Sequence, residues 1–263
     1  MSERLTMPPA PSRPPELHDD FADGLSEERW MAHYLPQWTT PERSAARVGL
    51  TAGALELRIE DDQPDWRPED APLRVSNLQT GAFSGPPGSS RGTHRHRDNI
   101  VVRTRMQQRL LFAPSSGRID VTVSASTDEG CMTAVWLVGT EHLSADDCGE
   151  ICVFEIDSDA ISSTGTTAAT TARSGIRAHG DSRLADDMAD VVVPVDGSRP
   201  HTWSVVWGAG VTLIGCEGVV VRRLEQAPDY PLFLMIDLFE VAPPGGSYPK
   251  TALLHEVSGW AGA

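Results

Sequence analysis

One short stretch, Gly149-Glu-Ile-Cys-Val-Phe-Glu155, sets two acidic residues into an apolar run. β-Branched and aromatic residues dominate this run, so it predicts a buried β-strand. An ionised carboxylate in such a place costs free energy unless it is paired or used. Two carboxylates that flank one point are what acid/base or glycosidic chemistry requires, so Glu150 and Glu155 are the first candidates for an active site.

The spacing of these two glutamates leaves two interpretations open. Successive side chains of a strand alternate between its faces, and Glu155 stands an odd number of positions after Glu150, on the opposite face of a regular strand. A single β-bulge between them would return both carboxylates to one face, and bulges are common beside active sites. Without a bulge, Glu155 would point to solvent and Glu150 would only begin the strand.

The rest of the chain predicts short strands separated by turns. Residues 55–59 and 118–125 alternate apolar and polar side chains, as half-buried antiparallel strands do. Residues 131–138 and 232–241 are almost wholly apolar, which indicates burial on both faces. Residues 158–174, rich in Thr, Ser and Ala, are expected to form a loop or a solvent-facing hairpin. The pattern contains no long amphipathic helix and no repeat, so it predicts an all-β sandwich.

The 263 residues are enough for one large β-domain, which we place at residues 19–263. Residues 1–18 are polar and rich in proline, so we expect a disordered or loosely attached arm. This arm lacks the apolar core of a signal peptide, which predicts a cytoplasmic protein, or an extracellular one if the start codon is wrongly assigned. No apolar run approaches the length needed to cross a membrane.

Charge narrows the range of partners. The formal net charge is -15 and the pI is about 4.8, which argues against nucleic acids and anionic membranes. An acidic protein is compatible with a neutral polysaccharide as its ligand.

The spacing of the cysteines and histidines does not match a common metal-binding motif. Cys148 and Cys152 have a C-x-x-x-C spacing, which is not a common zinc pair, and His94 and His96 lie among arginines. No motif indicates a calcium site, although a structural calcium ion is possible. We therefore expect no cofactor and no bound metal. Four residues along a strand span about 13 Å, beyond the reach of a disulfide, so both thiols are expected to be free.

Taken in order, several short motifs resemble those of glycoside hydrolase family 16, a group of concanavalin-like β-glucanases. The stretch from Glu150 to Glu155 resembles the family signature E-[ILV]-D-x-x-E, in the form that contains a bulge. The resemblance covers roughly residues 21–260. Its other landmarks are Gly117-Arg-Ile119, Trp136-Leu-Val-Gly139, His201-Thr-Trp-Ser-Val-Val-Trp207 and Tyr248-Pro249.

The resemblance implies a β-jelly roll of two antiparallel sheets and a retaining, endo-acting glycosidase or transglycosylase. Its partner would be a β-linked polysaccharide or oligosaccharide, and we expect a monomer. By position, Glu150 would be the nucleophile and Glu155 the general acid/base, with Glu150 kept ionised and the pKa of Glu155 raised. Three further side chains are candidates for lining the substrate cleft: Trp136, Trp38 and His201.

The sequence departs from the family pattern at sensitive positions. Cys152 stands where the family has an Asp that supports the nucleophile, and a thiol carries no fixed charge near neutral pH. Cys152 could donate a hydrogen bond to Glu150 or simply fill space. Ala145 stands where many members have a sugar-stacking Trp, and Val206 replaces a Glu.

These departures keep alternatives open. The chain could be a catalytically impaired, lectin-like carbohydrate-binding relative, or an interaction domain on the same sandwich. A pure lectin, however, has no reason to keep two destabilising carboxylates in an apolar strand. In a second register, Glu155, Asp157 and Asp159 resemble the unbulged form E-x-D-x-E, with Glu155 as nucleophile and Asp159 as acid.

Overall fold

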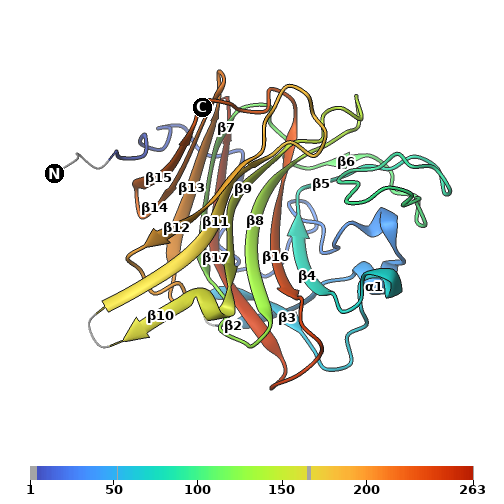
Figure 1. Ribbon diagram of the computed structural model, residues 1–263, viewed down its shortest axis with the longest axis horizontal. Helices are drawn as coiled ribbons and strands as arrows, with labels where there is room; N and C mark the ends of the chain where they lie inside the picture. Colours follow the sequence, from blue (N-terminus) through green and yellow to red (C-terminus); the bar gives the residue numbers. More distant parts are fainter. Residues whose placement is uncertain (1–4, 52, 165–166, 263) are drawn as a thin grey trace.

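The alternating segments pair into two large antiparallel sheets, which the computed structural model describes over residues 5–51, 53–164 and 167–262 (Figure 1). The expected all-β sandwich of antiparallel sheets is confirmed. We call the first sheet the back sheet. In spatial order it contains β15 (Val219–Leu224), β14 (Val211–Cys216), β13 (His201–Gly208), β7 (Gly117–Ser124), β17 (Lys250–Ala261), β3 (Ala54–Ile59) and β2 (Arg47–Thr51), and β1 (Leu17–Asp19) pairs with β17.

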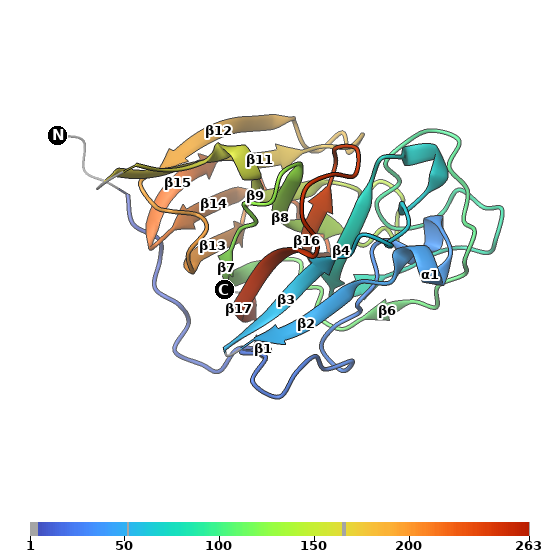
Figure 2. The same cartoon turned by 90° about the horizontal axis from the view of Figure 1, so that it is seen from below.

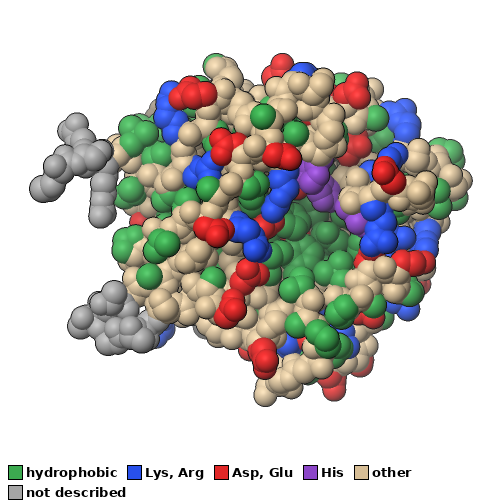
Figure 3. Space-filling view, in the orientation of Figure 1, with side chains coloured by type: hydrophobic (Ala, Val, Ile, Leu, Met, Phe, Trp, Pro, Cys, Tyr) green, Lys and Arg blue, Asp and Glu red, His purple; other side chains and the backbone are tan. Residues whose placement is uncertain are grey.

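The second sheet is called the cleft sheet, because the surface above it is hollowed (Figure 3). In spatial order it contains β10 (Ile161–Thr164), β11 (Thr167–Arg177), β9 (Glu150–Asp157), β8 (Cys131–Gly139), β16 (Leu232–Glu240) and β4 (Arg74–Gln79), and β12 (Asp187–Val193) pairs with β11. The smaller elements are β5 (Gly81–Ala82), β6 (Arg109–Leu110), α1 (Pro41–Ser44) and the 3₁₀ turns η1 (Pro36–Trp38), η2 (Pro68–Asp70) and η3 (Ser158–Ala160).

The main core lies between the two sheets, which are seen nearly edge-on in Figure 2. Alternate residues of the back sheet point into it, such as Val121 on β7 and Val205 on β13. Phe154 of the cleft sheet meets Trp203 of the back sheet, with ring centroids 4.9 Å apart. The period-two pattern of the sequence therefore selects the buried face of each back-sheet strand.

A second apolar cluster covers the other face of the cleft sheet. Trp136 of β8 and Phe233 and Phe239 of β16 pack there against Trp38 and Trp66 from the long segments before β4. Every residue of β16 is buried as a result, which explains why its sequence is apolar throughout. The cleft sheet is thus covered on both faces, except where the cleft opens.

The N-terminal segment differs from the loose arm expected for residues 1–18. Over the described residues 5–18 it packs along the back sheet: Thr6 bridges to Val219, Met7 is buried, and Leu17 pairs with Gly259 of β17. The prolines lack N–H donors, but the apolar residues between and after them still find sites on the sheet. None of the helices in the described ranges is long and apolar enough to cross a membrane.

Candidate active site

A β-bulge in β9 brings the two candidate glutamates to one face. Val135 of β8 pairs with Phe154 and the next residue, Trp136, pairs with Cys152, so Val153 is the extra residue. Strand β11 shows the same shift, because Arg173 faces Glu155 while Gly175 faces Cys152. The carboxylates of Glu150 and Glu155 consequently converge, each with an oxygen within 4.8 Å of the other and of the Cys152 thiol.

The bulge leaves backbone carbonyls that the regular ladder would have used, and Ser174 of β11 satisfies them. Its hydroxyl donates to the carbonyl oxygens of Val153 (2.9 Å) and Cys152 (3.3 Å). Gly175 follows with φ at +151°, and a Cβ there would overlap the carbonyl oxygen of Asp187. The sequence Ser174-Gly175 therefore fits the bulged strand as its neighbour.

Two arginines of β11 neutralise the converging carboxylates. Arg177 donates from Nη1 to Glu150 Oε1 (2.6 Å), and the same nitrogen lies 2.8 Å from Glu155 Oε1. Its Nη2 donates to Glu155 Oε2 (2.9 Å), and Arg173 Nε reaches the same oxygen at 3.0 Å. Glu150 is 2% and Glu155 6% exposed, so these pairs offset a desolvation that would otherwise be prohibitive.

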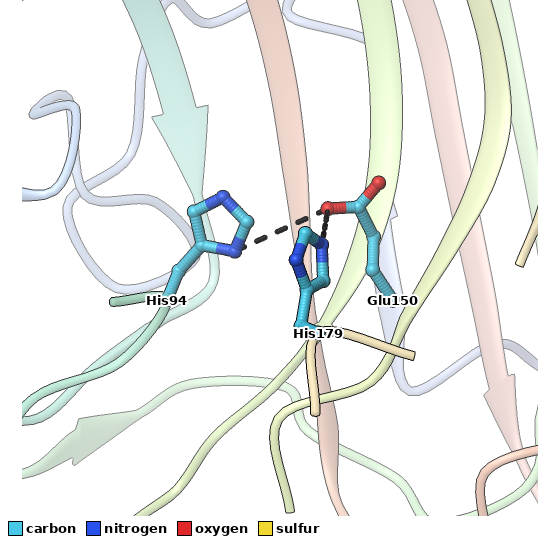
Figure 4. Close-up of side chains that lie close together, drawn as sticks. All are labelled: His94, Glu150 and His179. Atoms are coloured by element: carbon cyan, nitrogen blue, oxygen red, sulfur yellow. Dashed lines mark hydrogen bonds and ion pairs between the residues drawn. The ribbon is translucent and has the colours of Figure 1, made fainter. Parts of the chain in front are cut away.

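Two histidines approach Glu150 from separate loops, as Figure 4 shows. His179, which follows β11, donates from Nε2 to Glu150 Oε2 at 3.0 Å, and His94 Nδ1 lies 4.0 Å from the same oxygen. Burial raises the pKa of Glu150, but the His179 hydrogen bond and nearby cationic groups, Arg177 among them, outweigh it and hold the pKa at about 2. Glu150 is therefore ionised at neutral pH.

The middle position of the signature is occupied by a buried thiol. Cys152 is fully buried, and its Sγ donates to the backbone oxygen of Arg173 at 3.5 Å rather than to Glu150. Burial, and after it the charges of Glu155 and Glu150, raises the thiol pKa well above its usual value. The side chain is thus a neutral filler between the two carboxylates.

The second register is not supported by the strand geometry. Strand β9 ends at Asp157, and Asp159 lies beyond it in η3. Asp157 is tied instead to Arg173 at 3.2 Å, and its side chain is 39% exposed. Only the first register places its acids together on one strand face.

A pocket of about 500 Å³ adjoins this group, and both His94 and His179 belong to its lining. Ala145 also lines it, and the backbone N–H of His94 donates to Glu141 Oε1 at 2.5 Å. Burial raises the pKa of Glu141 to about 8 despite that hydrogen bond. The pocket wall carries charged side chains of both signs, three of them basic and three acidic: Arg91, Arg95, Arg97, Asp98, Glu141 and Asp146.

The three candidate substrate-binding residues lie in different environments. Trp136 is near the site: it is the cross-strand partner of Cys152, and its ring stacks on His94 with centroids 6.4 Å apart. Trp38 is fully buried in the second apolar cluster and donates to the Thr93 carbonyl oxygen, so it presents no face to a sugar. His201 belongs to the back sheet, where its Nδ1 lies 3.1 Å from Glu217. Only Trp136 is therefore next to the glutamates.

Four residues that surround the glutamates were missed by sequence reasoning. Arg173 and Arg177 are four residues apart, and His179 follows two residues later, just past β11, so the three could have been recognised as one face had their segment been paired with β9. His94 comes from a Gly- and Ser-rich loop, and its spacing gives no signal of contact with Glu150.

The surface above the cleft sheet shows how these parts combine. Figure 3 shows a hollow with an apolar floor over β8 and β16, bordered by histidine and by alternating basic and acidic side chains. Trp136 of β8 and Phe239 of β16 belong to the apolar cluster on this face of the cleft sheet, and their ring centroids lie 5.4 Å apart. An apolar floor with charged groups on one rim suits a ligand that has both ring faces and polar edges.

No protein-family model matches the chain, and no curated protein sequence matches it. Solved structures do resemble it. A GlcNAcα1-4Gal releasing endo-β-galactosidase from Clostridium perfringens is 18% identical with a TM-score of 0.76, and the match covers 96% of this chain and 65% of that one.

Two further structures match over most of both chains. SCLam, a non-specific endo-β-1,3(4)-glucanase from family GH16, is 16% identical with a TM-score of 0.62, covering 97% of this chain and 94% of that one. The laminarinase catalytic domain from Thermotoga maritima is 14% identical with a TM-score of 0.57, covering 94% and 97%. The chain thus has the concanavalin-like jelly-roll fold seen in family 16 glycoside hydrolases, as its motifs predict.

Proposed function

We propose that this protein is a retaining glycoside hydrolase or transglycosylase that acts on a β-linked polysaccharide, with Glu150 as nucleophile and Glu155 as general acid/base. The observation that carries the proposal is the bulge, which sets both carboxylates on one face with oxygens within 4.8 Å. Retaining enzymes hold their two carboxyls about 5–5.5 Å apart, whereas inverting enzymes need room for a water between them. The fold is consistent with this reaction.

Glu150 meets the electrostatic requirement for a nucleophile. Its carboxylate stays ionised because its pKa is held at about 2, against the effect of burial, by the His179 hydrogen bond and neighbouring cations. The attack would form a glycosyl ester on Glu150 while Glu155 protonates the leaving oxygen, and water or a second sugar hydroxyl would then release the ester with Glu155 as base.

Glu155 must carry a proton at the first step, and in this structure two arginines bind it. Arg177 Nη2 and Arg173 Nε both donate to Glu155 Oε2, at 2.9 and 3.0 Å, so this oxygen is occupied. We infer that a sugar entering between Glu150 and Glu155 displaces Arg177 from Glu155, which frees the carboxyl to contact the leaving oxygen. Arg177 would keep its bond to Glu150, whose partner set includes His179 as well.

The same contacts favour a second candidate, a carbohydrate-binding protein without hydrolytic activity. Arg177 closes the gap between the two carboxylates, and the supporting Asp of the family is replaced by Cys152. If Arg177 stays in place when sugar binds, both oxygens of Glu155 remain occupied and neither can reach the glycosidic oxygen. The floor around Trp136 would still bind a sugar.

The test is hydrolysis by the parent protein and by Glu150→Gln and Glu155→Gln variants on a panel of β-glucans and β-galactans. The parent should release reducing ends, and the rate of release should be at least about 10²-fold lower in each variant. Because Glu155 assists the leaving group, its variant should recover part of the rate on an aryl glycoside that needs no proton. The control variant is Glu225→Gln, which changes a glutamate that directly follows β15 of the back sheet and pairs with Arg223. Its rate of hydrolysis should equal that of the parent.

Proton NMR of the first product would show which anomer forms. Retention of configuration supports the double displacement, and inversion would contradict it. Sugar binding without any release of reducing ends would favour the second candidate. Release that survives in both variants would show that other residues catalyse the reaction.

A further inference from the structure

Three side chains around one carboxylate oxygen have the spacing of ligands to a single ion. His94, Glu150 and His179 each offer one donor atom, and these three atoms lie within 4.8 Å of one another (Figure 4). Glu150 Oε2 lies 3.0 Å from His179 Nε2 and 4.0 Å from His94 Nδ1. Ligand atoms of a tetrahedral zinc ion at about 2.0–2.1 Å stand roughly 3.4 Å apart, so small shifts would seat an ion.

The donor types select the class of metal. Two imidazoles and one carboxylate are the ligands of Zn²⁺ and its first-row neighbours, whereas Ca²⁺ and Mg²⁺ prefer oxygen ligands alone. Glu150 would bind through Oε2 only, because its other oxygen is held by Arg177 at 2.6 Å. Such a bond to the non-ligating oxygen is typical of the surroundings of metal-bound carboxylates.

The two imidazoles are held in place before any ion arrives. Both residues have left-handed backbones, with φ of 52° at His94 and 51° at His179, and their rings meet edge to face at 5.2 Å. The bond from the His94 N–H to Glu141 fixes the first loop. The 500 Å³ pocket beside both rings gives an entry path and space for a fourth ligand such as water.

We propose that His94, Glu150 and His179 form a binding site for one divalent transition-metal ion of the zinc class. The functional consequence rests on the proposed function: an ion on Glu150 occupies the nucleophilic oxygen, so the loaded protein is inactive and removal of the ion restores hydrolysis. The site then regulates the glycosidase by competition for a single oxygen atom.

Binding is tested without any substrate. Protein stripped with a chelator is titrated with Zn²⁺ by calorimetry, and with Co²⁺ by its visible absorption, which reports coordination geometry. We expect one ion per chain and a tetrahedral Co²⁺ spectrum. His94→Ala and His179→Ala should each weaken binding at least tenfold, a loss of about 1.4 kcal/mol or more.

The matched control is His201→Ala, because His201 also faces a glutamate, Glu217, but on the back sheet. This variant should bind Zn²⁺ as the parent does. Binding that is absent, or that is unchanged in both His94→Ala and His179→Ala, would overturn the site. Circular dichroism of each variant would verify that it is folded.

Inhibition is measured separately on a substrate found in the hydrolysis panel. Zn²⁺ should abolish hydrolysis by the parent and by His201→Ala at one equivalent, and a chelator should restore it. Zn²⁺ that binds at this site but leaves the rate unchanged would refute the regulation. Stripped protein that binds Zn²⁺ and hydrolyses no glycan would count against the proposed function and leave the metal site standing.

Discussion

Two groups of buried charge in this molecule look alike and differ in what surrounds them. The site group consists of Glu150, Glu155, Arg177 and His179 on the cleft sheet. The anchor group consists of Glu240 at the end of β16 with Lys250 and Tyr248 at or before the start of β17. In both groups the carboxylates are almost completely buried and bonded to cations.

The anchor group satisfies one carboxylate from several sides. Glu240 Oε1 forms an ion pair with Lys250 Nζ at 2.7 Å and accepts a hydrogen bond from the Tyr248 hydroxyl at 2.8 Å. Lys250 Nζ also donates to the Glu129 carbonyl oxygen at 2.5 Å. It ties the cleft sheet to the back sheet. In the site group two carboxylates share the Arg177 guanidinium beside a pocket, and each has one further partner, His179 for Glu150 and Arg173 for Glu155. Buried charge alone therefore does not indicate function, but two converging carboxylates next to open space do.

The largest expected effect comes from breaking the anchor group. Lys250→Met leaves Glu240 buried without its ammonium partner, and removal of one member of a buried pair destabilises by about 3–5 kcal/mol. Urea unfolding measures this loss, and activity per folded molecule should not change. The double variant Glu240→Gln/Lys250→Met should recover much of the stability, because no buried carboxylate is left with only Arg74, 3.5 Å away, as its cation. A loss below about 1 kcal/mol would contradict the comparison.

A third buried acid sharpens the comparison because no cationic side chain among the described residues forms an ion pair with it. Asp237 of β16 is bonded to Asn77 at 2.7 Å, and burial first, then the charge of Glu150, raises its pKa well above 3.8. The folded state keeps this proton while the unfolded state loses it above pH 3.8. The free energy of unfolding should therefore fall as pH rises from there to the folded pKa, by about 1.4 kcal/mol per pH unit for this group.

Asp237→Asn removes that titration, since the amide cannot ionise. The variant should show a flatter dependence of the free energy of unfolding on pH, and its stability relative to the parent should rise as the pH rises from about 4 to 7. Denaturant unfolding of both proteins across the range from about pH 4 to pH 7 measures the difference. Parallel curves for variant and parent would show that Asp237 is ionised in the folded state.

The smallest expected effect tests the bulge itself. Ser174→Ala removes the hydroxyl that donates to the carbonyl oxygens of Val153 and Cys152. We expect this loss to lower the free energy of unfolding by about 1 kcal/mol. The rate of hydrolysis per folded molecule should also fall, because the bulge sets the separation of Glu150 and Glu155. Ser162→Ala, an exposed serine of the same hairpin, is the control, with a change within about 0.5 kcal/mol. Equal effects of both variants would refute this role for Ser174.

The sequence predicts the faces of the strands better than their partners. Alternation at Leu55, Leu57 and Ile59 indicates which side is buried, and the structure agrees. Nothing in that pattern says that β3 pairs with β17, because pairing is decided by packing between segments far apart in the chain. For the same reason Glu150 and Glu155 could be found from local spacing, whereas Arg177 and His179 required the register of β11 against β9.

Errors about aromatic residues have a different cause. Trp38 is a candidate from the sequence for lining the substrate cleft, yet its ring is buried and its N–H donates to the Thr93 carbonyl oxygen. A tryptophan in an apolar, Pro-containing segment suits a core and a sugar platform equally well, and only the surrounding loops decide between them.

The position of β17 has a consequence for how the chain reaches its folded state. This strand follows every other strand in sequence, yet it lies between β7 and β3 and also pairs with β1, so that His18 contacts Ser258 across 240 positions. The back sheet cannot close, and the edges of β3 and β7 stay unpaired, until β17 has emerged from the ribosome. Folding therefore completes only after translation of this strand, and aggregation competes during the delay.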